Sequence, residues 1–176
     1  MKITVVVDVQ NDFVYDALGS ADAANAIGNI METLMQVDKT DFVIFTRDTH
    51  GKNYMDTREG KNLPVPHCIY GTHGWDVVES VDSCVCKMQK MYINKPIFGS
   101  YNLIDTISEM IDMYNADEVE LFGFCTDICV ISNALMVRSA FPEIKVTVRE
   151  NCCAGVTPEK HAAAIEVMKS CQIEIV

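Results

Sequence analysis

One cysteine of this chain lies where proteins often place a nucleophile. Cys129 follows the apolar run 119–124, which predicts a buried strand, and precedes the run 131–137, which predicts a helix. Thr126 and Asp127 are good N-cap residues, so Cys129 is expected in the first helical turn. There the positive end of the helix dipole favours a thiolate. The alternative is that Cys129 is a small apolar core residue, as buried cysteines often are.

Two charged residues are expected at the ends of other strands. Asp8 ends the apolar run 3–9, and Lys95 precedes Pro96 at the end of a third strand. A buried carboxylate there is either a general base with a raised pKa or a structural acid that caps the next loop. An inward-pointing ammonium between a carboxylate and a thiol would stabilise the ionised form of both.

A second polar cluster is expected in the long, polar segment 47–74. Asp48 and His50 follow the second predicted strand, and His67 comes 17 residues later. Two imidazoles and a carboxylate can bind Zn²⁺ and leave positions open for water or substrate, and Fe²⁺ or Mn²⁺ would also fit. The alternative is that these groups hydrogen-bond within the loop.

Alternating strands and helices are expected to position these residues. Strand-like and helix-like patterns alternate along all 176 residues, with no linker or repeat, which predicts one domain, 1–176, of a three-layer α/β class with a mainly parallel sheet. In such sheets, sites gather at the carboxyl ends of the strands. The strands are expected at about 3–9, 42–46, 86–93, 119–124, 144–148 and 173–176.

Composition excludes several classes of protein. The net charge of −11 argues against a sequence-independent nucleic-acid binder, because phosphates need a basic surface. No apolar run approaches the roughly 20 residues of a membrane span, and residues 2–7 read as a strand rather than a signal peptide. Eight cysteines without a secretory signal are most simply reduced thiols, which predicts a cytoplasmic protein.

The motifs in their order resemble the isochorismatase-like cysteine hydrolases and, within them, the nicotinamidases. The resemblance spans nearly the whole chain and rests on five segments: Asp8-Val-Gln-Asn-Asp-Phe13, Asp48-Thr-His50, Pro66-His67-Cys68, Lys95 followed by Ser100-Tyr101, and Gly123-Phe-Cys-Thr-Asp-Ile-Cys-Val130. It implies a doubly wound, six-stranded sheet with strand order 3-2-1-4-5-6. It also implies a homodimer or a larger homo-oligomer.

The resemblance further assigns roles to individual residues. It implies a catalytic triad of Cys129, Asp8 and Lys95, and an oxyanion hole formed by the backbone N–H groups of Cys125 and Cys129. Cys125 corresponds to the residue after an unusual cis peptide bond. The metal ligands implied by the resemblance are Asp48, His50 and His67.

The sequence departs from the nicotinamidase pattern at two positions. Thr49 stands where those enzymes usually have Trp after the metal-binding aspartate. Leu63 and Pro64 stand where an aromatic residue usually precedes the Pro-x-His segment. The candidates that remain for an aromatic wall around a pyridine ring are Phe13, Phe98 and Tyr101.

Together these features predict a hydrolase of small-molecule amides that works through a thioester, with nicotinamide to nicotinate plus ammonia as the leading reaction. A divalent metal, Zn²⁺ first, and no organic cofactor are expected. One alternative is a hydrolase of the same superfamily that acts on a carbamoyl or ureido compound or on a vinyl ether. The other is a non-catalytic partner subunit, against which the intact triad argues.

Overall fold

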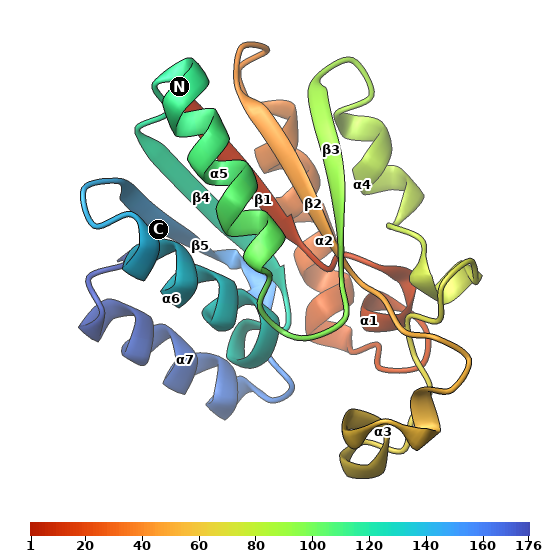
Figure 1. The fold of residues 1–176 in the computed structure, drawn as a ribbon. Helices are drawn as coiled ribbons and strands as arrows, with labels where there is room; N and C mark the ends of the chain where they lie inside the picture. The colour runs from red at the N-terminus through yellow and green to blue at the C-terminus, as the bar shows by residue number, and fades with distance from the viewer.

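A six-stranded parallel sheet forms the centre of the protein (Figure 1). The computed structural model describes all 176 residues, and the strand order is β3-β2-β1-β4-β5-β6, as the resemblance implied. The strands are β1 (Lys2–Val7), β2 (Phe42–Asp48), β3 (Gln89–Lys95), β4 (Glu118–Phe124), β5 (Lys145–Ala154) and β6 (Glu174–Ile175).

Helices cover both faces of the sheet. In Figure 1, α5, α6 and α7 lie on the face toward the viewer, while α2 and α4 lie behind. This arrangement follows from right-handed crossovers in a sheet whose strand order reverses direction between β1 and β4. The α-helices are α1 (Asn11–Val14), α2 (Ala21–Met35), α3 (Arg58–Asn62), α4 (Glu79–Cys84), α5 (Tyr101–Tyr114), α6 (Ile131–Ala140) and α7 (Pro158–Ser170).

The burial of β1 and β4 explains their mostly apolar sequences. Both strands lie inside the sheet and pair with each other in parallel, and both of their faces are covered by helices. A strand in that position has few solvent-facing side chains, so it largely lacks the polar alternation of a surface strand. The three-layer α/β class predicted from the sequence is therefore confirmed.

Several strand boundaries differ from the predicted ones by two residues or more. β1 ends at Val7 rather than Val9, because Asp8 has a φ of 50° and leaves the extended region. β3 begins at Gln89 rather than Cys86, since Cys84 still belongs to α4. β5 continues past Val148 to Ala154. Apolar composition alone does not reveal these local backbone changes.

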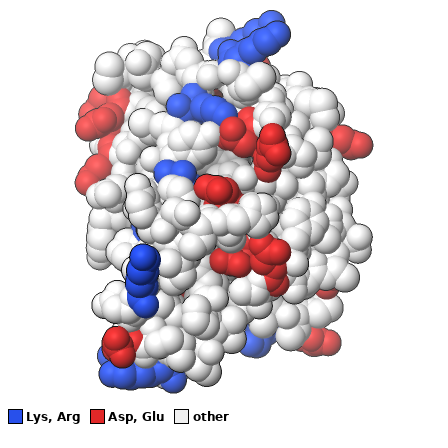
Figure 2. Space-filling model, turned by 90° about the vertical axis from the view of Figure 1, so that its right-hand side faces the viewer, with Lys and Arg blue, Asp and Glu red and all other residues white.

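The charged side chains are dispersed. Figure 2 shows Lys and Arg as separate patches between Asp and Glu side chains on the face that it presents. A surface of this kind offers no continuous basic stripe to a phosphate backbone. None of the helices combines the length and the apolar character that crossing a membrane requires.

Gly123 allows β4 to approach β1 closely beside the site. Its φ is 131°, which residues with side chains rarely adopt, and a Cβ atom at this position would overlap the carbonyl oxygen of Val7. The overlap involves backbone, so no side-chain rotation could relieve it. A glycine is therefore required here.

We predict that Gly123→Ala lowers the free energy of unfolding by on the order of 3 kcal/mol or more, because backbone strain adds to steric overlap. Gly28→Ala is the matched control, since Gly28 lies in α2 and a Cβ added there would have no other atom within 4 Å. The control should stabilise the protein by about 0.5–1 kcal/mol through helix propensity. Urea unfolding of both variants measures the difference, and an unchanged midpoint for Gly123→Ala would contradict the prediction.

Candidate active site

Asp8, Lys95 and Cys129 meet at the carboxyl end of the sheet. The Nζ atom of Lys95 lies 2.6 Å from Oδ2 of Asp8 and 3.4 Å from Sγ of Cys129. The three residues are almost inaccessible to solvent, with exposed fractions of 0%, 1% and 3% for Asp8, Lys95 and Cys129. Residues distant in sequence thus form one compact group of acid, ammonium and thiol.

The surrounding backbone and side chains hold the two charged members in place. Thr46, on the neighbouring strand β2, donates a hydrogen bond of 2.7 Å from its hydroxyl to Oδ1 of Asp8. Oδ2 is then directed at Lys95. Lys95 also donates to the carbonyl oxygen of Ile97 at 3.2 Å. The carboxylate and the ammonium therefore have little freedom to rotate away from the thiol.

Burial sets the proton affinities of the group. It raises the pKa of the Asp8 carboxyl, although Lys95 opposes the rise. Burial alone would lower the pKa of Lys95, but the charges of Asp8, Cys129 and Asp48 together outweigh it, and the pKa is raised. Burial also raises the pKa of the Cys129 thiol well above its usual value, and Asp8 adds to this rise. Burial and the neighbouring charges therefore favour the charged form of Lys95, the neutral form of the Cys129 thiol and a more basic Asp8 carboxylate.

The turn that carries Cys129 differs from the predicted first turn of an α-helix. Residues Thr126–Val130 form a π-helical turn before α6, and neither predicted N-cap residue caps it. The hydroxyl of Thr126 instead pairs with Nδ1 of His161 at 2.8 Å, and Asp127 accepts a hydrogen bond from the backbone N–H of Val156. Burial favours the neutral thiol rather than the thiolate that the helix dipole was expected to favour, and residue spacing does not reveal burial.

The turn before Cys129 has the backbone feature that the resemblance implied. The peptide bond between Phe124 and Cys125 is cis. Cys125 stands between the end of β4 and the π-helical turn, and it lines the same pocket as Cys129. The backbone N–H groups of both residues thus belong to the segment that borders the thiol.

A pocket of about 380 Å³ opens beside Cys129. Phe13 and Phe98 line it, as predicted, and Leu63 lines it where an aromatic residue was expected from the resemblance. The structure does not place Tyr101 there. Its side chain is 82% exposed at the start of α5 and faces a separate surface groove. The assignment of Tyr101 to the pocket wall was wrong, because the helix it begins points that side chain to solvent.

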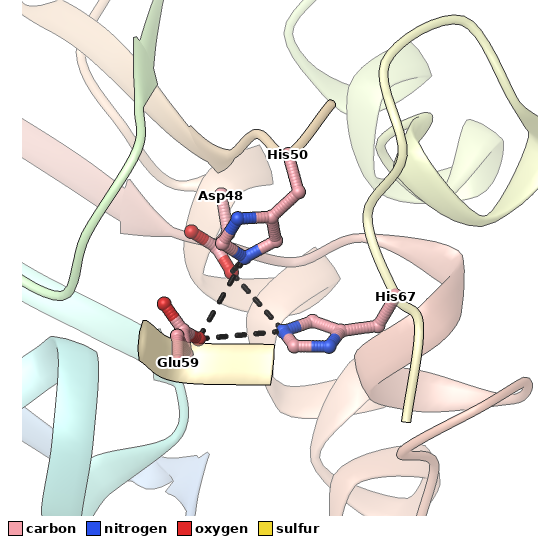
Figure 3. Close-up of side chains that lie close together, drawn as sticks. All are labelled: Asp48, His50, Glu59 and His67. Atoms are coloured by element: carbon pink, nitrogen blue, oxygen red, sulfur yellow. Dashed lines mark hydrogen bonds and ion pairs between the residues drawn. The ribbon is translucent and has the colours of Figure 1, made fainter. Parts of the chain in front are cut away.

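Four potential metal ligands converge at the other side of the pocket (Figure 3). Asp48, His50, Glu59 and His67 each offer one atom, and these atoms lie within 4.8 Å of one another. Nε2 of His50 is 3.0 Å from Oδ2 of Asp48, and Nε2 of His67 is 3.4 Å from the same oxygen. The structure therefore brings together the three predicted ligands and adds Glu59.

Glu59 was missed in the sequence. Its Oε1 lies 3.7 Å from Nε2 of His50 and 3.9 Å from Nε2 of His67. It stands on the short helix α3, whose first turn is capped by the hydroxyl of Thr57. In the sequence, Glu59 is marked only by being an acidic residue between His50 and His67. Asp56 is another acidic residue in the same segment, so the sequence does not distinguish the two.

The cluster has the chemistry of a divalent metal site. Oδ1 of Asp48 is buried without a hydrogen-bond partner, and burial together with Asp48 raises the pKa of Glu59. His67 uses Nδ1 to bond the carbonyl oxygen of Val65 at 2.9 Å, which leaves Nε2 facing the cluster. Two imidazole nitrogens and two carboxylates suit Zn²⁺, Fe²⁺ or Mn²⁺. A cation at this position would offset the crowded negative charge.

Gln10 fixes the backbone of Asp48. Its amide oxygen accepts from the Asp48 N–H at 2.7 Å, and its amide nitrogen donates to the Asp48 carbonyl at 2.9 Å. The same nitrogen donates to the carbonyl of Trp75 at 2.8 Å. The indole of Trp75 in turn donates to the hydroxyl of Thr49 at 2.9 Å. A tryptophan from a distant segment thus lies against the position where nicotinamidases usually have Trp.

The fold and the site define an α/β protein of the cysteine-hydrolase type, in which a buried thiol, lysine and aspartate adjoin a cluster of metal-binding residues. The profile of the isochorismatase domain matches residues 2–176. The chain belongs to the isochorismatase family.

Relatives within this family include enzymes with stated activities. The nicotinamidase/pyrazinamidase of Mycobacterium tuberculosis is 28% identical over 191 residues, covering 100% of this chain and 98% of the relative. A crystal structure of the pyrazinamidase of Pyrococcus horikoshii in complex with zinc matches with a TM-score of 0.78 and 25% identity, over 99% of this chain and 98% of the other. The pyrazinamidase/nicotinamidase of Streptococcus mutans shares the fold, with a TM-score of 0.86 at 24% identity over the full length of both chains.

We predict that protein purified without chelators carries a divalent metal and that His67→Ala loses most of it, because the change removes a nitrogen ligand. His73→Ala is the matched control, since the His73 side chain is 79% exposed and lies outside the cluster. Elemental analysis of both variants beside the wild type measures metal per chain. Equal metal content in the two variants would exclude the cluster as the binding site.

Proposed function

We propose that this protein is a nicotinamidase, which hydrolyses nicotinamide to nicotinate and ammonia. The observation that carries the proposal is the position of the Lys95 ammonium, 2.6 Å from Asp8 and 3.4 Å from the Cys129 thiol, which itself lines a largely apolar pocket. Membership of the isochorismatase family and the nicotinamidase relatives support the choice of an amide substrate.

The first half of the reaction forms a thioester. Asp8 accepts the proton of the Cys129 thiol as the sulfur attacks the amide carbonyl carbon. Lys95 stabilises the charge that moves between Asp8 and the sulfur. The carbonyl oxygen becomes an oxyanion near the backbone N–H groups of Cys125 and Cys129. The C–N bond then breaks, and Asp8 returns the proton to the departing ammonia.

The second half releases the acid. Water attacks the thioester carbonyl while Asp8 accepts one of its protons. The C–S bond then breaks, Asp8 returns that proton to the Cys129 sulfur, and the acid loses the second water proton to solvent as nicotinate. The raised pKa of Asp8 suits a group that takes up and returns a proton in each half-reaction. Because burial raises the pKa of the Cys129 thiol, its deprotonation requires such a base.

Asp48, His50 and His67, joined by Glu59, would hold the metal, which we propose to be Zn²⁺, with Fe²⁺ or Mn²⁺ as alternatives. When bound, such an ion supplies a Lewis acid that can coordinate a ring nitrogen or a water molecule. Phe13 and Phe98 would enclose the ring, with Leu63 in place of the usual aromatic side chain.

A second candidate is a hydrolase of the same family that acts on a carbamoyl or ureido compound. The aliphatic side chain of Leu63 in the pocket wall favours this alternative, because a wall without an aromatic ring at that position is less specific for pyridine. Ammonia release measured over a small panel of amides distinguishes the two. A non-catalytic subunit is disfavoured, because a buried charged pair without a chemical role is a costly feature to retain.

We also propose that the protein works in the cytoplasm as a homo-oligomer. The free state of all eight cysteines supports a reducing compartment. The oligomer rests on the family resemblance. Light scattering of the purified protein measures its number of subunits.

Cys129→Ala should abolish ammonia release from nicotinamide while the fold survives, because only the nucleophilic sulfur is removed. Cys153→Ala is the matched control, since Cys153 is also buried but lies outside the pocket. A coupled ammonia assay and thermal unfolding of both variants provide the measurement. Substantial turnover by Cys129→Ala would refute the proposed nucleophile.

Asp8→Asn should lower kcat by about 10²–10⁴-fold, the usual contribution of general acid–base catalysis, because an amide cannot accept the thiol proton. Lys95→Met should also reduce kcat, since Asp8 would lose its charged partner. Because groups that act together are not additive, the double variant should be little slower than either single variant. Near-native turnover by Asp8→Asn would mean that Asp8 is only a structural acid.

A further inference from the structure

Asn133 is a buried polar residue that the proposed reaction does not use. It lies in α6, four residues after Cys129, with an exposed fraction of 0%. Asparagine is a poor residue for a helix interior, because its side chain competes for backbone hydrogen bonds. Its burial here is accompanied by hydrogen bonds to two separate segments.

The side-chain amide of Asn133 connects the nucleophile's turn to the loop that follows Lys95. Its nitrogen donates to the carbonyl oxygen of Cys129 at 2.8 Å and to that of Phe98 at 3.0 Å. Its oxygen accepts the backbone N–H of Ser100 at 3.1 Å. Both N–H groups and the carbonyl oxygen of the amide are thus satisfied, so the side chain has one defined orientation.

The connected loop contains groups that face the site. Lys95 donates to the carbonyl oxygen of Ile97, directly before the Phe98 carbonyl that Asn133 binds. The side chain of Phe98 lines the pocket. Gly99 lets the loop approach α6 closely, since a Cβ there would lie 2.5 Å from Sδ of Met136. Asn133 therefore joins the segment that orients the lysine to the segment that carries the thiol.

We propose that Asn133 is a positioning residue, which sets the separation of the Lys95 ammonium and the Cys129 sulfur by holding their two segments together. The inference rests on the proposed function, because it assigns these two groups to the chemistry. The separation of 3.4 Å spans two segments with no covalent link between them nearby. A shift of about 1 Å between reacting groups can reduce turnover by about 10²-fold.

Asn133→Leu tests the inference, because leucine keeps the branched shape and loses all three hydrogen bonds. On folded protein, kcat for nicotinamide should fall by about 10- to 100-fold, with a smaller change in KM. Alkylation of Cys129 by iodoacetamide, resolved from the other cysteines by mass spectrometry, should become slower, because the ammonium that stabilises the forming thiolate moves away.

Ser132→Ala is the matched control. Ser132 neighbours Asn133 in α6 and bonds only the carbonyl oxygen of Ile128, at 2.6 Å, in its own helical segment. Its loss should leave kcat and Cys129 alkylation within about twofold of the wild type. If Asn133→Leu also keeps kcat and Cys129 alkylation within about twofold of the wild type, Asn133 only stabilises the fold, and the inference is overturned whatever the melting temperature of the variant.

Asn133→Thr covers the case in which the leucine variant does not fold. A threonine hydroxyl can bond the carbonyl four residues earlier but is too short to reach the loop. Slower turnover and slower Cys129 alkylation would support the connection to the loop, and wild-type values for both would overturn it. The alkylation measurement needs no substrate. If the wild type does not hydrolyse nicotinamide, the proposed function is wrong, but the alkylation rates still test the role of Asn133.

Discussion

The ion pair between Asp8 and Lys95 is the interaction on which the site depends. Both side chains are fully buried, with 2.6 Å between the charged atoms. Moving either charge out of water costs several kcal/mol, and removing one partner of such a pair typically destabilises a protein by about 3–5 kcal/mol. Each charge is therefore acceptable only because the other is present. The thiol of Cys129 lies against this pair, 3.4 Å from the Lys95 ammonium.

The parallel sheet makes this pair possible. Asp8 follows β1 and Lys95 ends β3, while β2 lies between them and supplies Thr46. Parallel strands end at the same edge, so the three strands bring an acid, a hydroxyl and an ammonium to one place, although they are far apart in sequence. β4 delivers Cys129 from the other side of β1 by the close approach at Gly123. The reversal of strand order between β1 and β4 thus opens the pocket beside the nucleophile.

Residues placed by the ends of strands could be predicted from the sequence. Residues placed by loops, and protonation states set by burial, could not. Strand order and the meeting of Asp8, Lys95 and Cys129 follow from apolar runs and the family resemblance. Glu59 could not be found, because a five-residue helix inside a polar loop has no periodicity to orient it. Tyr101 was misplaced because an aromatic residue beside a motif can point either way at a helix start. The protonation of Cys129 depends on burial, which spacing does not report.

Lys95 also couples the thiol to the cluster of metal-binding residues. Its Nζ lies 3.6 Å from Oδ1 of Asp48, the buried oxygen without a hydrogen-bond partner. The ammonium of Lys95 thus faces the carboxylates of both Asp8 and Asp48, and its single positive charge is shared between these two carboxylates. A cation bound by the cluster would neutralise the carboxylate of Asp48. The ammonium of Lys95 would then interact mainly with the carboxylate of Asp8. Because a better neutralised carboxylate is a weaker base, occupancy of the cluster should make Asp8 accept the thiol proton less readily. The two halves of the site are therefore one electrostatic unit, which explains why so many charged groups can share a buried position.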